Sequence, residues 1–82
     1  MITSGMNELT LNDIPKNGVA RVKSIDAGGL SNRLLEMGFY PNQKIQVVSV
    51  APVGDPIAVQ VGNSMVLLRR SEASGIVVES IT

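Results

Sequence analysis

The stretch Ile57–Val61 reads IAVQV, and its three large apolar residues alternate strictly with alanine and glutamine. A period of two places all three on one face of a β-strand, because successive side chains point to opposite sides. Gly62-Asn63 follows directly and predicts a two-residue hairpin turn. The segment Met65–Arg70, which begins with four apolar residues, is then expected to be the returning strand. This hairpin constrains the chain to an antiparallel sheet.

Three further segments are expected to complete the sheet: Val19–Ile25, Lys44–Val50 and Ile76–Ile81. The apolar phase of the second segment flips between Val47 and Val48, which suggests a bulge or a corner. Five short strands joined by tight turns predict a mainly β fold, a small antiparallel barrel whose closure would remove exposed strand edges. A chain of 82 residues accommodates one such domain, with residues 1–6 as a loose N-terminal extension.

Helical signals are short. Leu30–Met37 is predicted to be a helix, because Leu30, Leu34 and Met37 fall at i, i+4 and i+7 and share one face. Arg33 and Glu36 are expected to face water. Single helical turns are expected over Leu9–Ile14, where Pro15 stops the turn, and over Ser71–Ser74, with Ser71 as the cap.

The end of the main helix is the most closely specified turn of the chain. Gly38 stands where a helix C-terminus requires a positive φ, and Phe39 follows as the hydrophobic residue that folds back on the last turn. Pro41-Asn42 fits the centre of a type II turn, because asparagine tolerates positive φ at the second position. Six residues are expected to set turn geometry: Gly38, Pro41, Asn42, Gly54, Pro56 and Gly62.

Composition excludes several classes of function. The chain has no cysteine and no histidine, and its carboxylates are scattered, so we expect no enzyme and no resident cofactor. Any metal ligands would have to be carboxylates, carbonyls or thioethers, and Met37 and Met65 sit in apolar patterns typical of a core. Seven basic and seven acidic residues give zero net charge, which disfavours a nucleic-acid partner. The N-terminus resembles no secretory signal and no apolar run spans a bilayer, so no membrane insertion and a cytoplasmic location are expected.

Four sequence blocks in fixed order carry a resemblance to a known family: RLLEMGF with Pro41, IQVV with Ala51-Pro52, Gly54-Asp55-Pro56-Ile57, and LRRSEA. Together they resemble the FeoA family, the small accessory proteins of bacterial ferrous iron transport, over about residues 9–79. Asn42 stands where this family commonly has glycine, and it can adopt the same φ. The resemblance implies an SH3-like barrel with a helix inserted between the first two strands. It also implies a partner, the FeoB membrane transporter with its cytoplasmic GTPase domain, and an association with transition metals that the residues themselves do not support.

The shaped turn after the helix carries no catalytic group and is suited to docking on a partner. Six residues are the candidate partner contacts: Arg33, Leu35, Phe39, Tyr40, Asp55 and Arg69. A packing role competes with this assignment for Leu35 and Phe39. One alternative stays open, a stand-alone metal-linked module related to the SH3-like domain of iron-dependent repressors. An RNA-associated barrel is a second, and an enzyme a third. The sequence leaves the oligomeric state open.

Overall fold

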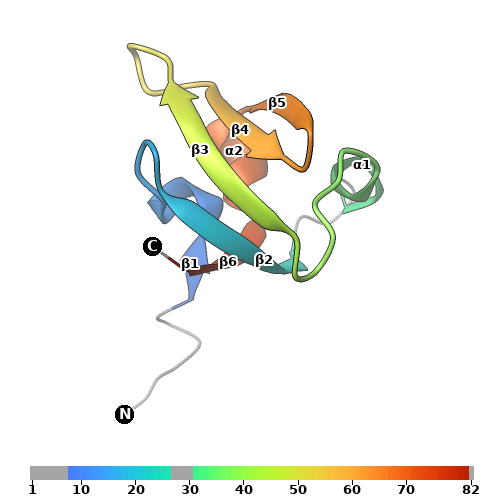
Figure 1. Cartoon of the computed structure of the whole chain (residues 1–82). Helices are drawn as coiled ribbons and strands as arrows, with labels where there is room; N and C mark the ends of the chain where they lie inside the picture. The colour runs from blue at the N-terminus through green and yellow to red at the C-terminus, as the bar shows by residue number, and fades with distance from the viewer. Residues whose placement is uncertain (1–7, 27–30, 82) are drawn as a thin grey trace.

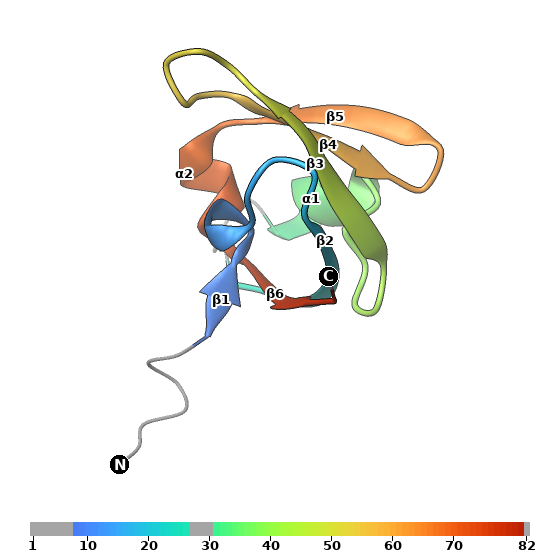
Figure 2. The same ribbon diagram turned by 60° about the vertical axis from the view of Figure 1, so that its left-hand side comes forward.

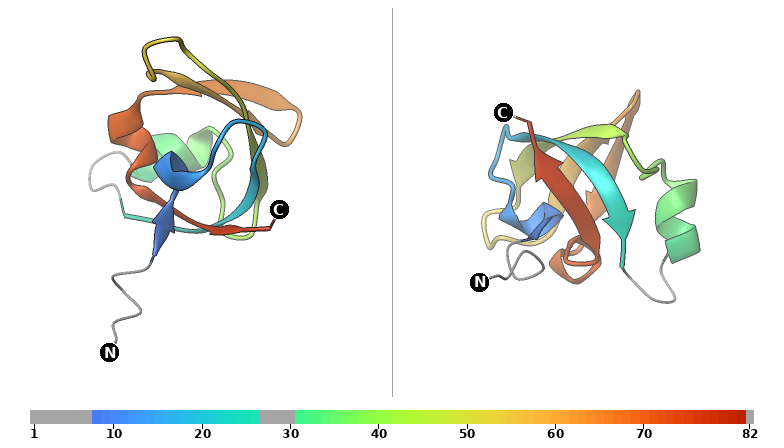
Figure 3. Two further views of the ribbon diagram at one scale, coloured as in Figure 1. Left: turned by 90° about the vertical axis from the view of Figure 1, so that its left-hand side faces the viewer. Right: turned by 90° about the horizontal axis from the view of Figure 1, so that it is seen from below.

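The computed structural model describes residues 8–26 and 31–81. Within these residues, six strands form one antiparallel sheet in the order β1-β6-β2-β3-β4-β5. The strands are β1 (Leu9–Thr10), β2 (Val19–Ile25), β3 (Lys44–Val50), β4 (Ile57–Val61), β5 (Ser64–Leu68) and β6 (Ile76–Ser80). Figures 1 and 2 show how the sheet curls round the core, and Figure 3 shows the same curl from the side and from below.

The helices are short and lie around the curled sheet. The 3-10 turn η2 (Leu11–Asp13) and helix α2 (Arg70–Ala73) lie side by side. Helix α1 (Ser31–Glu36) lies on the opposite side of the molecule from η2 (Figures 1 and 3). The predicted mainly β fold, with a helix inserted between the first two long strands, is confirmed. Leu30, the predicted start of the helix, and the predicted N-terminal extension lie outside the described residues.

The strand predictions hold closely in the middle of the chain. β2, β3 and β4 have the predicted bounds, and the register of β3 on β4 shifts between Val47 and Ser49, so the phase flip does mark a bulge at Val48. Other predicted bounds were wrong. The helical turn predicted over Leu9–Ile14 is confined to η2, because Leu9 and Thr10 pair with Val78 and Val77 of β6 as strand β1. β5 ends at Leu68 and α2 begins at Arg70, so the predicted strand was too long.

The sheet is not closed by hydrogen bonds, contrary to the sequence prediction of a closed barrel. In the described chain, β1 and β5 each have one neighbouring strand and remain edges of the sheet. After β5 the chain leaves the sheet at Arg69 to form α2, and it returns as β6 between β1 and β2 rather than beside β5. The two edges differ in length, since β1 has two residues and β5 has five.

The core is aliphatic apart from one ring. Phe39, Leu11, Leu34, Leu68 and Ile76 are fully buried, together with the inward residues of β2, β3 and β4. Leu34 of α1 and Phe39, which follows the helix, bring this end of the molecule into the same cluster. Burying each such side chain stabilises the fold by about 1.5–3 kcal/mol, and this burial holds α1 against the sheet.

Candidate functional site

The candidate site is built around the end of α1. The N–H of Phe39 donates to the carbonyl of Leu34 at 3.1 Å, and the N–H of Gly38 donates to that of Leu35 at 3.0 Å. This pair of bonds is a Schellman motif, and Gly38 has the positive φ it requires, +106°. The predicted helix end is therefore confirmed, and the chain direction after α1 is fixed by hydrogen bonds.

The following turn holds Tyr40 in place. Asn42 has a φ of +76°, and the N–H of Gln43 donates to the carbonyl of Tyr40 at 3.0 Å, as in the predicted type II turn. Asn42 and Gln43 also bond Val22 of β2, at 2.7 and 2.9 Å between backbone nitrogen and oxygen. Tyr40 is 55% exposed on this anchored backbone. The ring is therefore presented to solvent from a rigid support.

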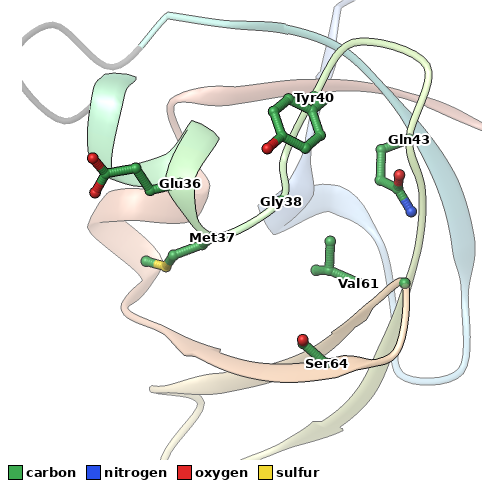
Figure 4. Close-up of a pocket in the computed structure, with 8 residues that line it drawn as sticks. Glu36, Met37, Gly38, Tyr40, Gln43, Val61 and Ser64 are labelled. Carbon is green, nitrogen blue, oxygen red and sulfur yellow. The ribbon is translucent and has the colours of Figure 1, made fainter.

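A pocket of about 300 Å³ lies between this turn and the β4–β5 hairpin. Its lining consists of Glu36, Met37, Gly38, Tyr40, Gln43, Val61, Gly62 and Ser64. Figure 4 shows Glu36 and Met37 at the end of α1, Tyr40 and Gln43 on the following segment, and Val61 and Ser64 on the hairpin. The lining combines apolar groups with a carboxylate, an amide and hydroxyls, which suits an apolar group of a partner surrounded by polar contacts.

A buried carboxylate joins α1 to α2. Glu72 is 8% exposed; its Oε2 accepts a charge-assisted hydrogen bond from Nη1 of Arg33, and its Oε1 accepts the N–H of Arg69 at 2.9 Å. The second bond satisfies a free N–H at the start of α2, as in one half of a capping box. Arg69 is thus the cap of this helix, and the prediction that Ser71 caps it was wrong.

A second set of bonds ties α2 to the 51–56 loop and to η2. Asp55 Oδ1 accepts the backbone N–H of Arg70 at 3.1 Å, and the Arg70 guanidinium Nε donates to the carbonyl of Gly54 at 2.7 Å. Asn12 Nδ2 donates to the carbonyl of Arg70 at 2.9 Å. Arg70 is therefore a structural centre that joins η2, the 51–56 loop and α2.

The structure separates the six predicted contacts by exposure. Tyr40 and Arg69 are exposed, and the side chain of Arg33 is 58% exposed although it pairs with Glu72. Leu35 and Asp55 are half-buried, and Asp55 holds the start of α2. One carboxylate, that of Glu72, accepts both the guanidinium of Arg33 and the backbone N–H of Arg69.

Phe39 was wrongly assigned as a contact. It is 0% exposed, because as the residue after Gly38 it folds back on α1 and packs in the core. Met65 shows the opposite error: it is 54% exposed rather than part of the core, because its strand is an edge and its side chain points outward. The burial of Phe39 follows from the helix-end pattern, whereas the exposure of Met65 depends on tertiary packing, which local patterns do not specify.

The predicted turn residues have the expected geometry where φ identifies it. Besides Gly38 and Asn42, Gly54 and Gly62 have φ values of +94° and +58°. Asp55-Pro56 is a cis peptide within the same loop as Gly54. Sequence reasoning missed the pocket residues Glu36, Met37, Gln43, Val61 and Ser64 as a group. One sequence signal pointed to this pocket: residue types closely specified both the turn after α1 and the turn after Val61.

Metal-binding and membrane-spanning features were also considered for the described part of the chain. Across residues 8–26 and 31–81, no three acidic side chains gather closely enough to hold a metal ion. Within the same ranges, the helices fall far short of the length and apolar character needed to cross a bilayer.

Comparison with known proteins gives a family match over most of the chain. A family model described as the FeoA domain matches residues 9–80. A curated relative, the Fe(2+) transport protein A/Fe(2+) transporter FeoB fusion protein of Porphyromonas gingivalis, is 42% identical over 55 residues. That match covers 67% of this chain and 6% of the relative, so this chain corresponds to a small part of the fusion protein.

Solved structures agree in fold. The FeoA-like protein of Clostridium acetobutylicum has a TM-score of 0.85 at 29% identity, covering 92% of this chain and 88% of its own. The zinc-complexed FeoA of Stenotrophomonas maltophilia, described as a procaryotic SH3 domain protein, has a TM-score of 0.78 at 36% identity, covering 87% and 89%. A manganese-dependent transcriptional repressor has a TM-score of 0.81 over 92% of this chain and 37% of its own, and at 17% identity this shows a shared fold alone.

Proposed function

Because the chain belongs to the FeoA domain family of iron(II) transport, we propose that it is a cytoplasmic accessory protein that docks on the GTPase region of a FeoB-type transporter. One observation carries this proposal. In the Porphyromonas gingivalis fusion protein, a segment 42% identical to this chain shares a polypeptide with the transporter. Two domains joined in one chain stay at high effective concentration, so their linkage favours a direct contact between them.

We place the docking surface at the pocket beside Tyr40. A volume of about 300 Å³ is at the lower end for ligand sites and matches an inserted apolar side chain better than a cofactor. Tyrosine is enriched among residues that dominate binding energy, and the fixed backbone on both sides of Tyr40 lowers the entropy lost on docking. The exposed Arg33 supplies a charge on α1, the helix that ends at this pocket.

The proposal assigns no catalytic step to this chain. A pocket whose lining has one carboxylate, Glu36, and no histidine or cysteine lacks the paired groups of acid–base or nucleophilic chemistry. The alternative, a stand-alone metal-linked module, rests on the fold shared with the repressor and on the zinc complex of the relative. No acidic cluster among the described residues favours it.

The test is a titration of the labelled protein with a FeoB-type transporter in nanodiscs, with GDP and with a GTP analogue. Tyr40→Ala is expected to weaken binding by roughly tenfold or more, as removal of an interface aromatic does. The matched control is Val53→Ala, which truncates a side chain that is 89% exposed and does not line the pocket. Absence of binding by the unaltered protein would refute docking. Equal affinities of the two variants would refute the placement at Tyr40.

A further inference from the structure

The long free edge of the sheet is β5. Among the described residues it pairs with β4 alone, as Figure 2 shows. The register sets Val61 opposite Ser64 and Ile57 opposite Leu68. A two-residue hairpin loop makes Val61 and Ser64 a hydrogen-bonded pair, so Ser64, Val66 and Leu68 direct their backbone groups to β4. The N–H and C=O groups of Met65 and Leu67 therefore point away from β4, toward the free side.

The side chains at this edge are apolar and exposed. Met65 is 54% exposed and Leu67 is 66% exposed, whereas the residues opposite them on β4, Gln60 and Ala58, are half-buried. Free backbone groups thus coincide with two exposed large side chains on one five-residue strand. Such a strand is a template for pairing with another strand.

This edge lacks the features that keep most edge strands apart. Proteins protect edges with charged residues, proline, bulges or very short strands. The other edge strand, β1, is protected by being very short, since it has two residues. By contrast, no residue between Asp55 and Arg69 is charged, β5 contains no proline, and its pairing with β4 has no bulge.

We propose that β5 pairs antiparallel with β5 of a second copy of this chain, about a two-fold axis at Val66. In this register Met65 lies opposite Leu67 of the second copy, and the two outward-pointing residues of each copy exchange four backbone hydrogen bonds. The exposed Met65 and Leu67 side chains of both copies then form one apolar patch on the outer face. This proposal is independent of the proposed docking on a transporter.

The absence of charge removes the main electrostatic penalty against pairing with a second copy. On a two-fold axis a charged strand tends to bring like charges close together, which is unfavourable, whereas an uncharged strand meets no such penalty. The first charge after the strand, Arg69, lies opposite Asn63 in this register, so no like charges meet there. Pairing of β5 with itself also closes after two copies, because both long edges are used.

The test is sedimentation velocity of the whole chain over a concentration series. The interface is small, so we expect a dimer with a Kd on the order of 100 µM, visible at about 1 mM protein. Leu67→Lys is expected to weaken the dimer at least tenfold, because it removes the apolar contact with Met65 of the second copy and sets two lysines diagonally across the two-fold axis. The matched control Val53→Lys adds the same charge at an exposed apolar position off the edge and should dimerise like the unaltered protein.

A double variant tests the register. Met65→Glu with Leu67→Lys places each glutamate opposite a lysine of the second copy, so dimerisation should return relative to Leu67→Lys alone. Thermal melts establish that the variants are folded. A monomer at every concentration, open-ended polymers in place of a dimer, or equal loss in Leu67→Lys and Val53→Lys would each overturn the proposal. Failure of the double variant to recover would also overturn it.

Discussion

Replacing Gly38 by alanine tests the turn that shapes the candidate site. Its φ of +106° lies outside the small left-handed region open to other residues, which costs about 1–2 kcal/mol. An added Cβ would also lie 3.0 Å from Cγ1 of Val61, which is 4% exposed and packed on β4. Overpacking of this kind costs about 1–3 kcal/mol, and alanine recovers about 0.4–1 kcal/mol by stiffening the unfolded chain. We expect a net loss of about 2–3 kcal/mol.

Urea unfolding followed by far-UV circular dichroism measures this loss. The midpoint should fall while the slope with urea stays constant, because the surface exposed on unfolding is unchanged. A loss of this size should also lower Tm by roughly 10–20 °C in a domain of this length.

Gly54→Ala is the matched control. Gly54 has a similar φ of +94°, but an added Cβ would meet nothing within 4 Å. This variant should therefore show only the backbone penalty less the same recovery from the unfolded chain, a net loss of about 1 kcal/mol. An unchanged midpoint in Gly38→Ala would refute the positive φ. Equal losses at the two positions would refute the packing contribution of Val61.

Three further changes have distinct expected outcomes. Glu72→Ala should cost about 1–3 kcal/mol, because it leaves the N–H of Arg69 without its acceptor, and a urea midpoint equal to that of the unaltered protein would contradict the bridging role. Phe39→Ala should cost about 3–5 kcal/mol in the same assay as a core truncation, so a loss within 0.5 kcal/mol, typical of an exposed residue, would restore it as a surface contact. Arg70→Ala should cost about 1–3 kcal/mol and raise hydrogen exchange of nearby amides, since the carbonyl of Gly54 loses its donor. Unaltered exchange would show that the guanidinium does not hold the 51–56 loop.

Local chemistry made much of the fold predictable. Alternation identified β4, and the phase flip at Val48 identified the bulge, because both follow from the period of a strand. Gly38 and Asn42 were predictable because positive φ restricts which residues can occupy a position. These features need no knowledge of distant parts of the chain.

The less predictable features all depend on partners far along the chain. Glu72 is one of the carboxylates that are scattered in the sequence, yet it is buried because Arg33, 39 residues earlier, supplies its counter-charge. Leu9–Thr10 is a strand only because β6 lies beside it. The pocket likewise needs α1 and the β4–β5 hairpin to meet, so its lining could not be deduced from either segment alone.

The position of β6 has a consequence for the order of events in folding. It follows every other described element in the chain, yet it lies between β1 and β2 in the sheet and carries three consecutive buried residues, Ile76–Val78. A nascent chain that ends before Ile76 therefore leaves β1 without a partner and one side of the core open. Contacts between the first and last strands are the slowest kind to form, because a long loop must close before they contribute. We expect cooperative folding only after β6 has emerged from the ribosome, which hydrogen exchange on stalled nascent chains of increasing length would detect.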